Sequence, residues 1–148
     1  MTTSSAVQAG AVSRNPFTGD IIRQTPFATA AEVETALAQA HGAFQHWRHS
    51  EVAERSQLLL NMAASLRKHA RALAEMMTDE MGKPITQSLA EVEKCARLCE
   101  WYAEQGPTIL APEATLVENE KAHVNYLPIG PILAVMPWNF PVWQALRG

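Results

Sequence analysis

Ile132-Leu133-Ala134-Val135-Met136, followed directly by Pro137-Trp138-Asn139-Phe140-Pro141, indicates the fold class of this 148-residue chain. The first five residues are apolar on both faces and lie between prolines, which is typical of a strand buried on both sides of a parallel sheet. Pro141 stands where a first helical turn would begin, because its missing N–H costs nothing there. The order of strand, loop and helix start therefore predicts an α/β fold.

The predicted strand at 132–136 has no second strand of its kind within the chain. Buried backbone N–H and C=O groups are almost always hydrogen-bonded, so a strand buried on both faces must be paired. We therefore expect its partner strands in sequence outside these residues or in another chain, and we expect the fold to be incomplete here.

Four helices are predicted upstream, where apolar residues recur at steps of three and four. The first should begin with a capping box formed by Thr29 and Glu32, and the second after Ser50 as its cap. The third should end at Gly82. The fourth should run from about residue 86 to residue 105, with Gly106-Pro107 ending it.

Two other segments are predicted to contain little helix. Residues 1–28 contain turn-forming residues and predict an extended arm, with a short strand at Ile21-Ile22. Alternating residues on either side of a turn at Asn119-Glu120-Lys121 predict a β-hairpin.

Composition argues against several classes of protein. The net charge is -3 and no basic stripe occurs, so we expect no nucleic-acid partner. No segment approaches the roughly 20 apolar residues of a membrane span, so no membrane association is expected. The first fifteen residues have no basic start and no continuous apolar block, so we do not expect a signal peptide there. Two cysteines without an export signal favour a cytoplasmic location.

Asn139 is the candidate for chemistry that the residues themselves suggest. It follows the predicted strand and precedes a helix start, which is where ligands bind in open α/β sheets. An amide donor that is preorganised toward a developing oxyanion is worth roughly 3–4 kcal/mol of barrier. The competing interpretation is structural, because Asn is also a favoured helix cap. Trp138 likewise has two interpretations: it is either an aromatic residue of the core or a residue of the site.

The two cysteines predict no metal site. Cys95 and Cys99 are four residues apart in the fourth predicted helix, and zinc would need two more ligands. Unreactive structural thiols are the favoured interpretation, with a zinc pair as the alternative. His46 and His49 are expected at the surface, at a helix junction.

Four motifs resemble the aldehyde dehydrogenase superfamily, and the resemblance extends over nearly everything after residue 14. They are NPFTGDII at 15–22, EMGKPITQSLAEV at 80–92, NYLPIGPILAVMPWNFP at 125–141 and VMPWNFPVWQALRG at 135–148. The chain looks closest to bacterial NAD(P)-dependent succinate-semialdehyde dehydrogenases, and to their amino-terminal part.

The resemblance implies a fold and a domain plan. An aldehyde dehydrogenase-like α/β fold is implied, with amino-terminal helices of the Rossmann-type coenzyme domain plus an oligomerisation β-hairpin. Residues 1–28 would be an extended N-terminal arm, 29–109 the helical part of the coenzyme-binding domain, 110–128 the oligomerisation hairpin, and 129–148 a coenzyme-domain strand and helix start. The implied assembly is a homodimer or homotetramer.

The resemblance also implies a reaction, the oxidation of an aldehyde to its acid with NAD or NADP through a thiohemiacetal. Asn139 falls on the family's oxyanion-binding position. Met136, Pro137 and Trp138, together with Asn139, fall on positions that line the coenzyme. Succinate semialdehyde is the implied substrate.

Arg147, eight residues after Asn139, stands where succinate-semialdehyde dehydrogenases are implied to hold the substrate's distant carboxylate. A guanidinium suits a carboxylate because it offers paired N–H donors. The alternative is an ordinary solvated charge near the end of a helix.

The nucleophile of the family follows a Gly-Gln-x-Cys context, which neither Cys95 nor Cys99 has. We therefore expect these 148 residues to be inactive alone. The alternative function is a short helical interaction module without catalysis. Reading the gene beyond the codon for Gly148 would discriminate between the two.

Overall fold

The computed structural model describes residues 10–117 and 120–147. In chain order its elements are β1 (Gly10–Arg14), β2 (Ile21–Pro26), α1 (Ala30–Trp47), α2 (Val52–Lys68), α3 (Ala70–Met81), α4 (Ile85–Ile109), β3 (Glu113–Val117), β4 (Glu120–Val124) and α5 (Pro141–Arg147).

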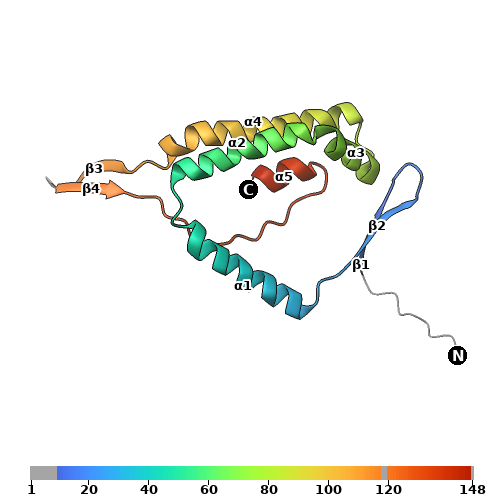
Figure 1. The fold of residues 1–148 in the computed structure, drawn as a ribbon, viewed down its shortest axis with the longest axis horizontal. Coiled ribbons are helices and arrows are strands. Elements are labelled where there is room, and N and C mark those ends of the chain that lie inside the picture. Colours follow the sequence, from blue (N-terminus) through green and yellow to red (C-terminus); the bar gives the residue numbers. More distant parts are fainter. Residues whose placement is uncertain (1–9, 118–119, 148) are drawn as a thin grey trace.

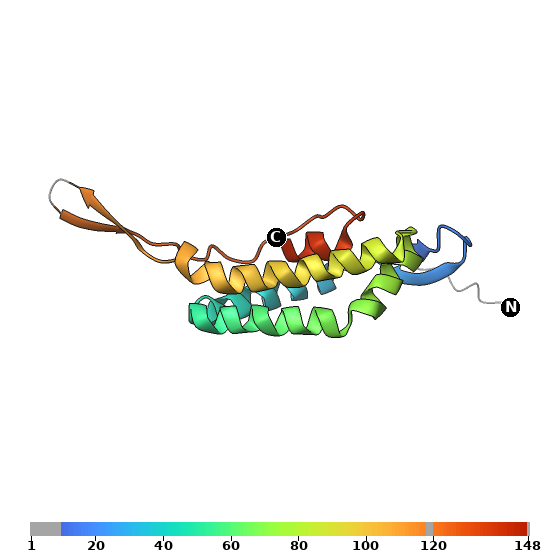
Figure 2. The same cartoon turned by 90° about the horizontal axis from the view of Figure 1, so that it is seen from above.

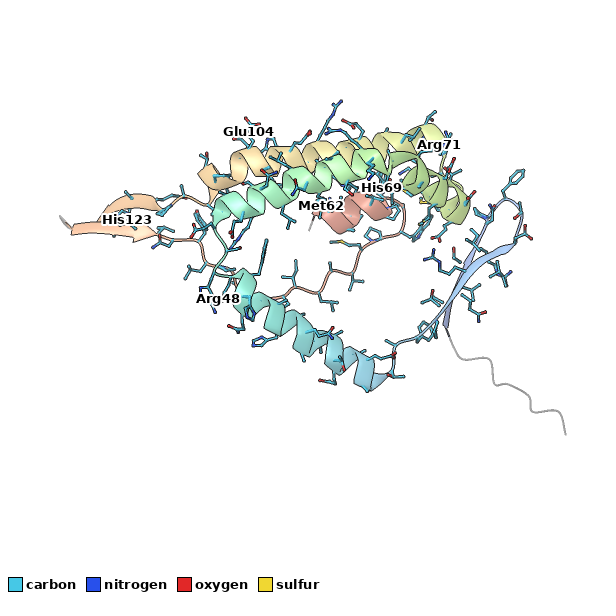
Figure 3. All side chains as sticks on the ribbon, in the orientation of Figure 1. Arg48, Met62, His69, Arg71, Glu104 and His123 are labelled. Atoms are coloured by element: carbon cyan, nitrogen blue, oxygen red, sulfur yellow. The ribbon has the colours of Figure 1, made fainter. Side chains whose placement is uncertain are left out.

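Helix α4 is the centre of the structure. It packs against α2, α3 and α5, while the two hairpins lie at opposite ends of the molecule (Figures 1 and 2). Helix α1 buries none of its residues, and its side chains stand clear of the other helices over most of its length (Figure 3). Helix α5, which ends the 138–147 segment, is positioned mainly by its packing on α4.

Small side chains line the contact between α2 and α4. Ala63 on α2 is buried against Ala96 and Cys99 on α4, and Leu59 and Leu66 pack around them. Small residues let two helix backbones approach closely, so the larger leucines can close the seam on either side. This close contact gives α4 a fixed place beside α2.

A surface ion-pair network joins the same two helices. Arg67 of α2 donates hydrogen bonds to the carboxylates of Glu93 and Glu100 on α4. These bonds, rather than burial, lower the pKa of both glutamates. Because the network is exposed, we expect it to contribute little to stability.

The predicted start of the first helix is confirmed and that of the second is wrong by one residue. The Thr29 hydroxyl accepts from the Glu32 N–H, and Glu32 accepts from the Thr29 N–H. The cap of α2 is Glu51 rather than Ser50. The Ser50 hydroxyl is used elsewhere: it donates to the Trp47 carbonyl oxygen at 2.7 Å, which ties it to the end of α1.

The predicted end of the third helix is confirmed, because Gly82 caps α3 in the left-handed conformation with a φ of 72°. The predicted end of the fourth is wrong, since α4 continues through Pro107 to Ile109. A proline so close to the end of a helix removes only one late hydrogen bond, and the Leu110 N–H still reaches the Gly106 carbonyl oxygen at 2.9 Å.

Gly82 offers a test of this geometry. Gly82→Ala should lower the free energy of unfolding by about 1–2 kcal/mol, because a side chain disfavours the left-handed region. The new Cβ would also lie 3.0 Å from Pro16 Cγ. The control is Gly42→Ala in the middle of α1, where a Cβ meets nothing within 4 Å and about 0.5–1 kcal/mol should be gained. Urea unfolding measures both, and a neutral Gly82→Ala would contradict the expectation.

Both hairpins are antiparallel. The predicted hairpin downstream of α4 is confirmed as β3–β4. Glu120 and Lys121, which the sequence predicts in the turn, instead pair with Val117 and Leu116 within the ladder, and Asn119 lies outside the described residues. At the other end, 10–26 forms the hairpin β1–β2 rather than an extended arm. Asn15 closes that turn by accepting from the N–H groups of Phe17 and Thr18.

The structure shows no strand over 132–136, which contradicts the sequence-based prediction. Residues 125–137 are irregular, and Leu133 and Val135 are 92% and 86% exposed. The physical reason is the one that the sequence itself suggests: no strand among the described residues offers this segment a ladder. Helix α5 nevertheless begins at Pro141, as predicted.

Candidate functional site

A carboxylate from α4 caps the start of α5. Pro141 has no N–H, so Val142 and Trp143 supply the first free donors of the helix. Both donate to Glu91 Oε1, at 3.1 and 3.0 Å. A negative charge at this end also complements the partial positive charge of a helix N-terminus.

Lys83 completes the arrangement. Its ammonium pairs with Glu91 Oε2, and the two side chains are 6% and 0% exposed. The same Nζ donates to the Asn139 carbonyl oxygen at 3.4 Å and lies 3.7 Å from the centre of the Phe140 ring. A buried ion pair thus connects the beginning of α4 to the loop before α5.

These contacts decide against the capping interpretation of Asn139. Glu91 accepts from the α5 amides that a capping side chain would satisfy. The Asn139 side chain is exposed and makes no hydrogen bond within 10–117 and 120–147, although its carbonyl group is held by Lys83. The amide is therefore available to an acceptor that the described residues do not supply.

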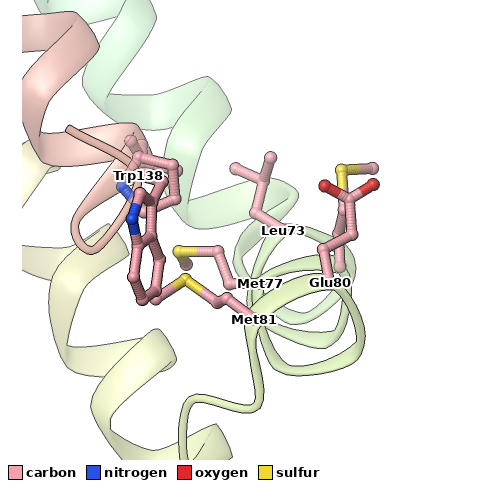
Figure 4. Close-up of a pocket in the computed structure, with 8 residues that line it drawn as sticks. Leu73, Met77, Glu80, Met81 and Trp138 are labelled. Carbon is pink, nitrogen blue, oxygen red and sulfur yellow. The ribbon is translucent and has the colours of Figure 1, made fainter. Parts of the chain in front are cut away.

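Trp138 is not a core residue. It is 73% exposed and lines a cavity of about 330 Å³ beside Met77 and Met81 of α3 (Figure 4). Met136, two residues earlier, is 39% exposed. Met136 and Trp138 therefore present exposed apolar surface.

Arg147 lies in the last turn of α5 and is exposed. It lines a second cavity of about 380 Å³, together with Leu59 of α2 and Tyr102 of α4. One turn earlier in α5, the Lys94 ammonium lies 3.7 Å from the centre of the Trp143 ring. Arg147 thus lines an open hollow at the carboxyl end of α5, whereas Trp138 lies just before its amino end.

The cysteines are buried, as expected for structural thiols. Cys95 and Cys99 are 0% and 3% exposed and face the helical core. Burial raises the pKa of Cys95 to about 11 and also raises that of Cys99. Among the described residues no group of three or more His, Cys, Asp or Glu side chains could hold a metal ion.

We expect neither thiol to react in the folded protein. With a pKa of about 11, roughly one Cys95 side chain in a thousand is a thiolate at pH 8. Iodoacetamide labelling followed by mass spectrometry should therefore modify both cysteines only after urea is added. Rapid labelling of either residue without urea would contradict the expectation.

Lys83 and Glu91 are the residues that sequence reasoning missed. One signal for Glu91 was present: it is a charged residue next to the buried stripe of α4, which contains Ser88, Val92 and Cys95. A carboxylate in such a position requires partners. Nothing in the spacing shows that those partners lie 51 and 52 residues further along the chain.

Known proteins resemble the chain over most of its length. It is 49% identical over 138 residues to the succinate semialdehyde dehydrogenase [NAD(P)+] Sad of Escherichia coli, covering 93% of this chain and 30% of that protein. It is 41% identical to a probable succinate-semialdehyde dehydrogenase [NADP(+)] of Synechocystis, covering 90% and 29%. The chain thus spans about 30% of the length of these curated relatives.

The fold is shared as well. The succinic semialdehyde dehydrogenase of Streptococcus pyogenes, solved in complex with NADP+, superposes with a TM-score of 0.87 at 31% identity, covering 93% of this chain and 30% of that one. A sequence profile of the aldehyde dehydrogenase family matches residues 2–148. The chain therefore belongs to the aldehyde dehydrogenase family.

Proposed function

We propose that the protein to which these residues belong oxidises succinate semialdehyde to succinate with NAD or NADP. The observation that carries the proposal is the Asn139 side chain, which is free of the capping role because Glu91 takes it. The identity to succinate-semialdehyde dehydrogenases supports the substrate class.

Asn139 is the catalytic residue that this chain would contribute. When a thiolate attacks the aldehyde carbon, the carbonyl oxygen gains negative charge, and an amide N–H can donate to it. The nucleophile of this proposal is a cysteine outside the present sequence, since Cys95 and Cys99 are buried with raised pKa values. The 148 residues alone are proposed to be inactive.

The exposed apolar side chains of the segment 136–138 are suited to contact a coenzyme. Trp138 and Met136 offer exposed apolar surface in a segment without regular secondary structure. We propose that Met136, Pro137, Trp138 and Asn139 line the NAD(P) site. When bound there, NAD(P) supplies the hydride acceptor for the reaction.

Arg147 is proposed to select the substrate. Succinate semialdehyde carries a carboxylate at the end opposite its aldehyde, and a guanidinium can bind that group through two parallel N–H bonds. Asn139 lies just before helix α5 and Arg147 lies in its last turn, so about two helical turns, roughly 11 Å along the helix axis, separate the two backbones. The two residues could therefore contact opposite ends of a short extended substrate.

The remaining assignments follow the family. The β3–β4 hairpin within 110–128 is proposed to serve a homodimer or homotetramer, and the helices of 29–109 to belong to the coenzyme-binding domain. The segment 129–148, with helix α5, is also proposed to belong to the coenzyme-binding domain. A cytoplasmic enzyme is proposed, and no described helix is long and apolar enough to cross a membrane.

The direct test uses the full-length protein. Purified enzyme should produce NADH or NADPH from succinate semialdehyde, detected at 340 nm, with succinate identified by mass spectrometry. Butyraldehyde, which has the same carbon chain without the carboxylate, should be used far less efficiently. Formation of no reduced coenzyme from any aldehyde would contradict the proposed function.

A further inference from the structure

We infer that Lys83 and Glu91 are positioning residues, which hold the backbone from Asn139 to Trp143 so that the Asn139 amide meets the substrate oxygen. The inference rests on the proposed function, because it takes Asn139 as the oxyanion donor. It extends that function to two side chains that do not touch the substrate themselves.

The pair fixes Asn139 from two sides. Lys83 Nζ donates to the Asn139 carbonyl oxygen at 3.4 Å. Glu91 Oε1 accepts from the N–H groups of Val142 and Trp143, at 3.1 and 3.0 Å. The residue that carries the proposed chemistry is thus held through its own carbonyl group and through the helix that follows it.

Phe140 adds a third point of attachment. The Lys83 ammonium lies 3.7 Å from the centre of its ring, a distance at which a cation is attracted to an aromatic face. Lys83 therefore contacts two consecutive residues of the loop while it also neutralises Glu91. One cation links the loop to the base of α4.

Stability alone is a weak explanation for this pair. The two side chains are 6% and 0% exposed, and taking both charges out of water largely offsets their attraction. Apolar side chains of similar volume often stabilise a protein equally well. What an apolar pair could not do is accept two helix amides and donate to a loop carbonyl group at the same time.

Positioning matters here because oxyanion donors work within narrow limits. A catalytic group must be held within about 0.5 Å of its productive place. A displacement of about 1 Å by a change outside the reacting groups can cost roughly 100-fold in rate. The irregular segment before Asn139 has no ladder of its own within the described residues, and the hydrogen bonds that hold this region come from Lys83 and from Glu91 of α4.

The test is a double-mutant cycle in the full-length enzyme, with Lys83→Met, Asn139→Ala and the two combined. Lys83→Met alone should lower kcat by about 10- to 100-fold. Added to Asn139→Ala, it should lower kcat by less than about twofold, because the group that it positions is already gone. A merely structural loss would reduce active protein equally in both backgrounds.

The control is Arg67→Met combined with Glu93→Gln, which removes an exposed ion pair between α2 and α4 that makes no hydrogen bond to the loop among the described residues. This variant should keep kcat in both backgrounds. Lys83→Met leaves the buried Glu91 charge unpaired, and if that variant fails to fold, Lys83→Met with Glu91→Gln replaces it in the cycle. Circular dichroism and thermal unfolding confirm folding before the kinetics are compared.

The outcomes separate the two claims. If Asn139→Ala lowers kcat but the Lys83 change leaves kcat intact, or lowers it equally in both backgrounds, the positioning role is overturned while the proposed function stands. If Asn139→Ala leaves kcat unchanged, the oxyanion role of Asn139 and the positioning role are both overturned, whereas the proposed oxidation itself is overturned only if the wild-type enzyme forms no reduced coenzyme. A Lys83 effect that disappears in the Asn139→Ala background supports the inference.

Discussion

Asn139→Ala in the full-length enzyme is expected to lower kcat for succinate semialdehyde by roughly 10²–10³. The expected loss is large because a preorganised amide donor stabilises charge that develops only in the transition state. In the structure this side chain is exposed and makes no hydrogen bond with the described residues, so its removal costs no hydrogen bond among them. Steady-state kinetics at saturating coenzyme measure the effect.

The control is Asn61→Ala on the exposed side of α2, which should leave kcat unchanged. Loss of a helix cap would produce a different result, a decrease of about 1 kcal/mol in unfolding free energy with normal kcat. Because Glu91 caps α5, we expect thermal stability to change little. Reduced stability with full activity would restore the capping interpretation of Asn139.

Arg147→Ala is expected to raise the KM for succinate semialdehyde by roughly 10- to 100-fold, since a hydrogen-bonded charge pair with the substrate is worth about 1.5–3 kcal/mol. The KM for butyraldehyde should change little, because butyraldehyde has no carboxylate. Helix α5 should stay intact, since Arg147 is exposed in its last turn. The ratio of kcat/KM for the two aldehydes is the measured quantity.

Arg97→Ala provides the matched control. Its side chain is 76% exposed on α4 and pairs only with Glu93 among the described residues, so both aldehydes should be used as before. Equal losses with both aldehydes in Arg147→Ala would remove the carboxylate-binding role and leave a general structural effect.

Local signals in the sequence predicted much of the helical fold. The Thr29–Glu32 capping box and the Gly82 stop are formed by residues within one or two turns of each other, so their chemistry is visible without the tertiary structure. The start of α5 at Pro141 is local in the same sense. Pro107 was wrongly predicted to end α4. A proline is tolerated in the last turn of a helix, but the sequence near Pro107 does not show that this turn is the last one.

Features that depend on residues far apart in the sequence could not be predicted from local patterns. The apolar run at 132–136 has the composition of a buried strand, but a strand exists only where a neighbour offers hydrogen bonds. The cap of α5 is supplied by Glu91 on α4, and no local sequence pattern near Pro141 indicates this. Asn139 and Trp138 could be singled out from their place before a helix start, whereas the roles of Met136, Pro137 and Arg147 were implied by the family resemblance.

The place of the Asn139 amide in the complete enzyme is the central claim, and a crystal structure of the full-length protein with bound coenzyme tests it most directly. The account predicts that the Asn139 side-chain nitrogen points into the site beside a cysteine from outside these residues, while Glu91 still accepts from the Val142 and Trp143 amides. An Asn139 side chain that turns to solvent, or that bonds to the start of α5 in place of Glu91, would contradict it.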